Sequence, residues 1–251
     1  MVRILAFAWV ILLFSVNVSL ATPSVGHVGG PGVKEGQLSI EWRNGYTQDN
    51  DPGNQNHRVL MWQFLDYGFN DTYAMRLVNV RNKFQGGSNT NQGFTLENRF
   101  HVIKRSVHGW DGGFRVNYTK NNGENSLDAV TLAFFSLFPF NENWEYRQNF
   151  WFATNVGSGS EQKVRMNIRQ EINKKYTLDH DYFSSVKYGL ELLNAFGRID
   201  DLGRYSDQDH QLGIYMNTGM VNDVSVRLGY RNSLSRGAED HSYELTLRYV
   251  F

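Results

Sequence analysis

The stretch Asp240-His-Ser-Tyr-Glu-Leu-Thr-Leu-Arg-Tyr-Val-Phe251 ends the chain, and its side chains alternate strictly between apolar and polar. Successive side chains of a β-strand point to opposite sides, so this period of two predicts a strand whose two faces meet different surroundings. The apolar face carries Tyr243, Leu245, Leu247, Tyr249 and Phe251, and the polar face carries Ser242, Glu244, Thr246 and Arg248.

The same alternation recurs along most of the chain. About twelve segments show it, each close to the ten residues that a tilted transmembrane strand needs. They cover roughly residues 37–48, 57–69, 72–83, 93–106, 113–121, 126–138, 143–156, 161–174, 183–196, 209–220, 223–235 and 240–251. The facing of the second, third and sixth segments stays open, since in the second Leu60 and Phe64 compete with Val59 and Leu65.

The connections between these segments alternate in length. Tight turns are expected at residues 70–71, 141–143 and 221–223, and longer polar loops at residues 49–56, 84–92, 197–208 and 234–239. Short turns at one end and long loops at the other are typical of outer-membrane barrels. The sequence therefore predicts an all-β fold, a transmembrane antiparallel β-barrel of about 12 strands. An even strand number places both chain ends at the short-turn, periplasmic end.

The beginning of the chain reads as a targeting signal. Arg3 precedes the apolar run 4–14, and Ser19-Leu20-Ala21 places small residues where a signal peptidase cuts. We therefore expect a signal peptide over residues 1–21. Residues 22–35 hold four glycines and two prolines and little to bury, which predicts a flexible periplasmic leader. Residues 36–251 form the predicted barrel.

Composition narrows the class of protein further. The chain has 17 Phe, 13 Tyr and 6 Trp, but no Cys, so disulfides cannot stabilise it. Its formal net charge is zero, which argues against nucleic acid as a partner. A soluble β-sandwich or a lipocalin-like barrel would show the same alternation. The length of the segments and a polar face rich in arginine and glutamate favour the membrane barrel.

If the apolar face meets lipid, the polar face lines the lumen. That face carries more base than acid, and a water-filled passage avoids a cost of several kcal/mol for each ion buried dry. Twelve strands should leave a narrow pore. The expected lumen bases are Arg43, Arg76, Arg99, Arg115, Arg147, Lys163, Arg165, Arg169, Lys187, Arg227, Arg231 and Arg248, and the expected acids are Glu41, Glu97, Glu145, Glu171, Glu191 and Glu244.

This basic lumen predicts passive, anion-selective transport, because guanidinium groups bind planar carboxylates through bidentate hydrogen bonds. Lys163, Arg165 and Arg169 on one strand, and Arg227 and Arg231 on another, are predicted to form two basic columns that bind solute. The alternative is a plugged structural or adhesive barrel, in which arginine–glutamate ladders brace the wall.

Two stretches carry a resemblance to a known family. The opening hairpin, Leu38-Ser-Ile-Glu-Trp-Arg-Asn-Gly-Tyr followed by His57-Arg58-Val-Leu, and the closing strand 240–251 resemble the small monomeric acidic-sugar porins. These are the oligogalacturonate-specific and sialic-acid outer-membrane channels of Gram-negative bacteria. The resemblance implies a monomeric twelve-stranded barrel with basic tracks in its lumen and acidic saccharides as solutes. Glu244 stands where a neutral or basic residue is expected.

The resemblance also implies the partners of the chain. A terminal strand ending in Phe251 looks like the signal that the bacterial barrel-assembly machinery reads. The bacterial outer membrane is the expected location, with its lipid and lipopolysaccharide around the barrel.

Catalysis has weaker support in the sequence. An outer-membrane hydrolase of the protease or lipase type would need acid–histidine pairs near the rim, and Asp209-His210 and Asp240-His241 are the candidates. Neighbouring residues of a strand, such as His241 and Ser242, point to opposite faces. The chain has no Cys, no His-Glu-x-x-His motif and no phosphate-binding loop. We therefore expect a protein that is not an enzyme, with no cofactor and no metal.

Overall fold

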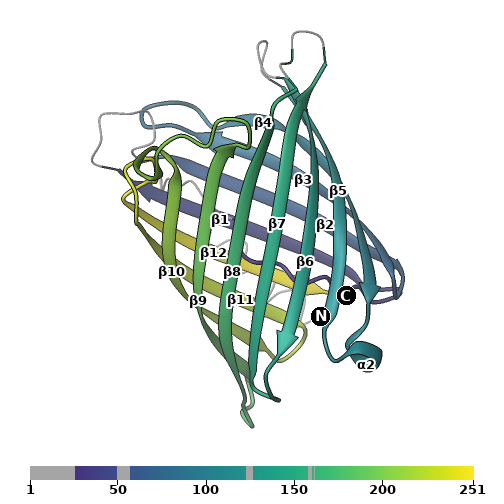
Figure 1. Ribbon diagram of the computed structural model, residues 1–251. Coiled ribbons are helices and arrows are strands. Elements are labelled where there is room, and N and C mark those ends of the chain that lie inside the picture. Colours follow the sequence, from purple (N-terminus) through teal and green to yellow (C-terminus); the bar gives the residue numbers. More distant parts are fainter. Residues whose placement is uncertain (1–25, 50–56, 123–126, 158–159, 161) are drawn as a thin grey trace.

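The computed structural model describes residues 26–49, 57–122, 127–157, 160 and 162–251. The predicted signal peptide, the first part of the predicted leader and most of the loop 49–56 lie outside these residues. Within the described chain, twelve antiparallel strands follow one another around a closed barrel, and the first pairs with the last (Figure 1). The strands are β1 (Leu38–Gln48), β2 (Val59–Asn70), β3 (Tyr73–Lys83), β4 (Thr90–Ile103), β5 (Asp111–Asn121), β6 (Asp128–Pro139), β7 (Trp144–Val156), β8 (Val164–Thr177), β9 (Phe183–Arg198), β10 (Asp209–Met220), β11 (Val224–Ser233) and β12 (His241–Val250).

The predicted fold class and strand number are confirmed, and most strand bounds differ from the prediction by one to three residues. The fourth predicted strand is too long at its end, because a helical turn, α2 (Arg105–His108), follows β4. Asp111 stabilises this turn by accepting hydrogen bonds from the Arg105 backbone amide and from its Nε, both at 2.9 Å. Gly109 ends the turn with a left-handed φ of 77°.

The barrel is inverted relative to a soluble protein. Its outward-facing side chains are apolar and exposed, with Leu77 at 51% and Ile214 at 55% of full exposure. Charged side chains such as Glu171, Glu191 and Arg231 are buried inside. A soluble barrel would bury its apolar face, so that alternative is wrong, and the apolar exterior fits the hydrocarbon of a membrane. No helix of the described chain is long and apolar enough to cross a membrane.

The structure also decides the facing that the sequence left open. In β2, Phe64 and Asp66 point into the lumen while Leu65 is exposed outside. In β6, Phe135 is buried inside and Phe134 faces outward. The lumen therefore contains aromatic side chains beside its charges, which alternation alone could not show.

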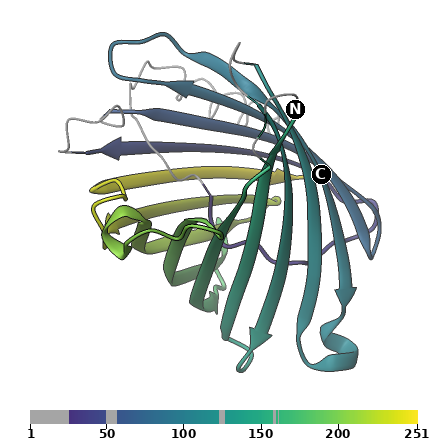
Figure 2. The ribbon, with the colours of Figure 1, turned by 45° about the horizontal axis from the view of Figure 1, so that its top comes forward.

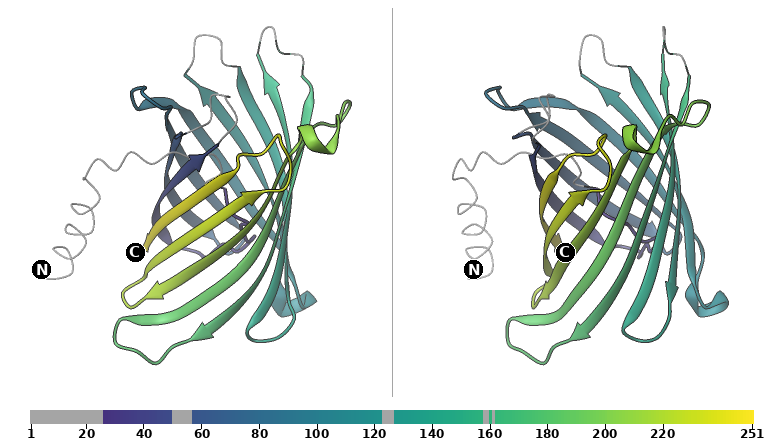
Figure 3. Two further views of the ribbon diagram at one scale, coloured as in Figure 1. Left: turned by 90° about the vertical axis from the view of Figure 1, so that its left-hand side faces the viewer. Right: turned by 60° about the vertical axis from the view of Figure 1, so that its left-hand side comes forward.

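The two ends of the barrel differ as predicted. The tight turns lie at one end, together with α2, and the longer connections and the 3-10 turn η1 (Tyr205–Asp207) lie at the other (Figures 1 and 3). The chain end also lies at the short-turn end, since the Phe251 amide donates to the Leu38 carbonyl at 2.9 Å.

Residues 26–35, called the lumen segment below, run inside the ring of strands (Figure 2, purple). This part of the leader, which the sequence predicted to be a flexible periplasmic segment, therefore lies within the barrel lumen. Val28 is fully buried, and the segment passes so close to the wall that a Cβ on Gly68 would lie 2.0 Å from the Lys34 carbonyl oxygen. Glycines in both the segment and the wall allow this approach, because they lack a side chain.

Candidate functional site

A cavity of about 700 Å³ occupies the lumen. Its lining runs from Gln92 and Asn121, near the long-loop end of the strands, to Gln37 and Ser225, near the short-turn end. The lumen segment forms part of this lining. The cavity is thus a passage along the barrel that the segment narrows from inside.

The surface of this cavity is strongly basic. Among the described residues that line it, only Glu41, Asp66 and Glu97 are acidic. The bases that line it number ten, namely Lys34, Arg43, Arg76, Arg99, Arg115, Arg147, Arg169, Lys187, Arg227 and Arg248. The excess arises although the whole chain is neutral, because many of its acidic residues lie in loops, turns or behind the arginines.

Nine of the twelve bases predicted to line the lumen lie on this surface. The other three do not line the cavity. Arg231 is buried behind it. Lys163 precedes β8, and Arg165 is exposed near the start of β8, where its Nη2 donates to Asn155 Oδ1 at 2.7 Å. The two predicted columns are therefore not continuous along the cavity.

Strands β2 to β5 contribute a first network of ion pairs. Arg76 lies between two carboxylates, 2.7 Å from Asp66 Oδ2 and 3.7 Å from Glu97 Oε2. Arg115 binds Glu97 at 2.9 Å, and Arg99 binds Asp66 at 3.0 Å. Asp66 was not among the predicted lumen acids. Its position two residues after Phe64 would have indicated its facing only if the facing of β2 had been known.

Phe64 supports two of these arginines. The Arg43 guanidinium lies 4.4 Å from the ring centroid, and that of Arg76 lies 4.9 Å from it. Arg43 also binds Glu41 of its own strand. Cation–π contacts and ion pairs together hold these cations in fixed positions on the wall.

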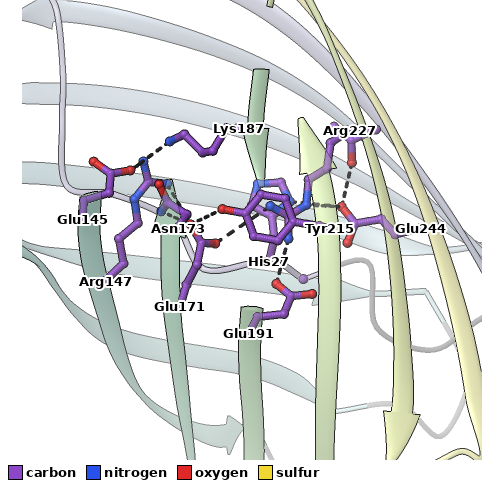
Figure 4. Close-up of polar contacts among 12 residues, drawn as sticks. His27, Glu145, Arg147, Glu171, Asn173, Lys187, Glu191, Tyr215, Arg227 and Glu244 are labelled. Atoms are coloured by element: carbon purple, nitrogen blue, oxygen red, sulfur yellow. Dashed lines mark hydrogen bonds and ion pairs between the residues drawn. The ribbon is translucent and has the colours of Figure 1, made fainter. Parts of the chain in front are cut away.

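Strands β7 to β12 contribute a second network, drawn in Figure 4. Arg227 Nη2 lies 2.7 Å from Glu191 Oε2, and its guanidinium stacks 3.5 Å from the Tyr215 ring centroid. The Tyr215 hydroxyl donates to Glu171 Oε1 at 2.5 Å. Nearer the short-turn end, Lys187 binds Glu145 at 2.8 Å. More of the predicted bases are paired than the sequence led us to expect.

The contacts of Glu244 explain why an acidic residue stands where the sequence led us to expect a neutral or basic one. Glu244 accepts from Arg231 Nη2 at 2.7 Å and lies 3.4 Å from Arg227 Nε. Its Oε1 also accepts from Thr246 Oγ1 at 2.8 Å and lies 3.2 Å from Nδ1 of His27 in the lumen segment. A neutral or basic residue here would leave Arg227 and Arg231 with one carboxylate fewer between them.

Arg169 differs from these paired arginines. Within the part of the chain that the structure describes, no carboxylate lies within ion-pair distance of it. Its guanidinium lies 5.4 Å from the Trp151 ring centroid, and Arg115 lies 5.0 Å from the same ring. Arg169 lines the cavity, so its charge is the one best placed to meet an anionic solute.

The candidate hydrolase pairs are separated by the alternation of their strands. His210 shares the outer face of Leu212, whereas Asp209 is on the lumen side. Both His210 ring nitrogens are engaged, by Asn194 and Gln208 at 2.8 Å. His241 lies on the outer face too, 3.0 Å from the Tyr230 hydroxyl. Among the described residues no group of three His, Cys, Asp or Glu side chains could hold a metal ion.

At the long-loop end, the pKa of the Glu239 carboxyl lies above its usual range. Burial, together with the nearby carboxylates of Asp209 and Asp49, raises the pKa of Glu239 to about 8. Arg58 opposes the shift from 4.0 Å, which is too distant to offset the burial. This carboxyl therefore titrates near neutral pH.

Comparisons with known proteins agree with this architecture. No family model matches the chain, and no curated protein matches its sequence. Solved structures do match. The KdgM porin is 12% identical with a TM-score of 0.54, covering 85% of this chain and 99% of that one. The NanC porin is 10% identical with a TM-score of 0.53, covering 84% and 98%. This chain has the fold of these porins.

A third similar structure is the COG4313 outer membrane channel from Pseudomonas putida F1. It is 12% identical with a TM-score of 0.56, covering 92% of this chain and all of the other. A second KdgM structure is described as a complex with disordered oligogalacturonate. The shared fold and the apolar exterior identify the chain as a transmembrane β-barrel.

Proposed function

We propose that this barrel is a porin for passive diffusion of small anionic solutes, with acidic oligosaccharides as the preferred class. The observation that carries the proposal is the basic surface of the cavity, where ten cationic side chains meet three anionic ones. The fold shared with the KdgM porin, for which a complex with oligogalacturonate is known, supports the solute class.

The arrangement suits transport rather than tight binding. The lining cations lie on several strands and along the length of the cavity, so a carboxylate can pass from one to the next. Conduction needs this balance between attraction at entry and release at exit. Trp62 and Trp151 line the same cavity and add apolar surface that can contact the C–H groups of a sugar.

A second candidate function follows from the two ion-pair networks. They connect neighbouring strands, and strands one apart, along the lumen wall, as arginine–glutamate ladders do in a plugged structural barrel. Such a barrel would hold its wall rigid and conduct no ions. The cavity and its excess of positive charge favour the porin.

Planar bilayer recordings test the proposal. In a salt gradient, the reversal potential should show preference for chloride over potassium, and the preference should weaken as salt rises, because charges are screened over about 10 Å at 0.1 M. Trigalacturonate should block the current at lower concentration than the neutral maltotriose. Absence of any conductance, in a barrel shown to be folded, would favour the structural candidate. Equal block by the two sugars would contradict the proposed preference for acidic saccharides.

A further inference from the structure

The lumen segment crosses the inside of the barrel from one wall to another. At its C-terminal end, Gly36 donates to the Gly68 carbonyl at 2.8 Å, beside β2. Pro31 lies against Gly113 of β5, where an added Cβ would be 2.9 Å from the proline Cβ. Its first described residues contact β8, β11 and β12. Figure 2 shows this course through the interior.

The middle of the segment is held through its main chain. With the amide nitrogen of Asn149 facing the Gly29 carbonyl, Asn149 donates to that oxygen at 3.0 Å and accepts from the Gly29 amide at 2.9 Å. Asn149 is fully buried on β7. The Asn149 amide thus pairs with both backbone polar groups of Gly29 and holds the segment in place, although Gly29 itself has no side chain.

The first described residues meet cations of the cavity. His27 contacts Glu244, and the Gly26 carbonyl accepts from Arg231 Nη2 at 3.4 Å. The Arg169 guanidinium packs directly on Gly26, because an added Cβ there would lie 2.0 Å from Arg169 Nη1. The segment thus occupies the space beside Arg169, the one cavity-lining arginine that has no carboxylate partner in the described chain.

The segment is attached by few side chains. Val28 is its one fully buried apolar side chain, and four of its residues are glycines. Within the described chain, its polar contacts with the lumen wall are made mainly by Asn149, Glu244 and Arg231. By contrast, each strand of the wall is held by a full ladder of backbone hydrogen bonds to two neighbours. The segment can therefore leave its position while the barrel stays closed.

We propose that the lumen segment is a displaceable constriction that sets the size limit of the pore and, in the narrow state, covers the side of Arg169 that packs on Gly26. The proposal rests on the proposed porin function, since a constriction matters only for a conducting barrel. Displacement of the segment widens the passage and exposes Arg169 to anionic solute. The segment then limits the size of the solutes that pass, and the cations of the lumen wall select them by charge.

Removal of residues 26–33 tests the constriction. The shortened barrel should show at least a twofold higher single-channel conductance and admit larger polyethylene glycols than the wild type. Gly32→Ala serves as the matched control, because nothing lies within 4 Å of its added Cβ. A deleted barrel that is folded by heat-modifiable mobility, yet has the conductance and size limit of the wild type, overturns the proposal. If the deleted barrel fails to fold, Asn149→Ala, which removes the contacts to Gly29, is compared with the wild type in the same two measurements.

A tether tests the displacement. The chain has no cysteine, so Gly30→Cys with Leu137→Cys creates one possible disulfide, and an added Cβ on Gly30 lies 3.6 Å from Leu137 Cδ1. Once non-reducing electrophoresis shows the bridge, the oxidised channel should stay at the narrow conductance, and reduction should restore wide openings. Identical traces before and after reduction overturn displacement.

These recordings separate the constriction from the porin function on which it rests. Anion preference is read from reversal potentials, whereas the constriction is read from conductance and from the polymer size limit. A deleted barrel that conducts more but prefers no ion would support the constriction and contradict the anion-selective porin.

Discussion

Arg231 Nη2 and Glu244 Oε2 lie 2.7 Å apart on neighbouring strands, and both side chains are at most 2% exposed. Breaking a buried pair by removing one partner leaves an uncompensated charge, which costs about 3–5 kcal/mol. We therefore expect Arg231→Ser to lower the free energy of unfolding by that order, measured by urea titration of the detergent-solubilised barrel.

The control for this change is a pair at the surface. Lys120 Nζ lies 3.0 Å from Asp128 Oδ2, with the lysine side chain 65% exposed. Lys120→Gln should leave the unfolding midpoint nearly unchanged, because solvent screens this pair. Similar losses for both variants would show that the Arg231 network does not stabilise the lumen.

Arg169 is expected to carry selectivity and little stability. Arg169→Gln keeps a hydrogen-bonding side chain but removes the positive charge that no described carboxylate compensates. The reversal potential should shift toward smaller anion preference, with an unfolding midpoint close to the wild type. Arg81→Gln is the matched control, because Arg81 faces away from the cavity, which Val80 lines. An equal shift in both variants would mean that net charge alone sets the preference.

The pKa of Glu239, raised to about 8, predicts a dependence of stability on pH. A folded-state pKa above the unfolded value means that the folded chain binds the proton more tightly. The stabilisation is therefore complete below about pH 4.5 and is lost as pH rises through about 8. Glu239→Gln, which cannot ionise, should flatten this decline in urea midpoints measured between pH 5 and 9. A variant with the wild-type slope would assign the pH dependence to other groups.

Gly68 is expected to tolerate no side chain. Its added Cβ would lie 2.0 Å from the Lys34 carbonyl oxygen. That oxygen accepts from the Gln37 amide, and the Gly36 amide donates to the Gly68 carbonyl, so the backbone here cannot easily move away. Gly68→Ala should therefore displace the end of the lumen segment and lower the unfolding free energy by about 1–3 kcal/mol. Gly32→Ala should have little effect on either measure. Trypsin cleavage after Lys34 reports the displacement, and unchanged protection in Gly68→Ala would contradict it.

The sequence determined the barrel because alternation is a local property. Each strand is identified by its own side chains, as β12 is by Tyr243, Leu245 and Leu247 on one face. Turn lengths then give the antiparallel order, and the number of strands gives the end at which the chain terminates. None of these steps needs a contact between distant residues, so the fold class and most strand bounds could be predicted.

The candidate site depends on contacts across the barrel, and here the sequence determined only part of the answer. It predicted that the polar face would be basic, and nine of the twelve named bases do line the cavity. It did not show that Arg231 is held by Glu191 and Glu244, because these residues lie on three different strands. Pairing in a closed barrel depends on register and on shear, which no single strand contains.

The tertiary structure alone decided the facing of β2 and the place of residues 26–35. Apolar side chains occur on both faces of β2, so only the lumen-facing partners of Asp66 and Phe64 on the neighbouring strands fix its orientation. The lumen segment has no periodicity, and its glycines read locally as flexibility. Those same glycines let the chain lie against Arg169 and Asn149 once the wall surrounds it, because a residue without a side chain fits where two backbones approach closely.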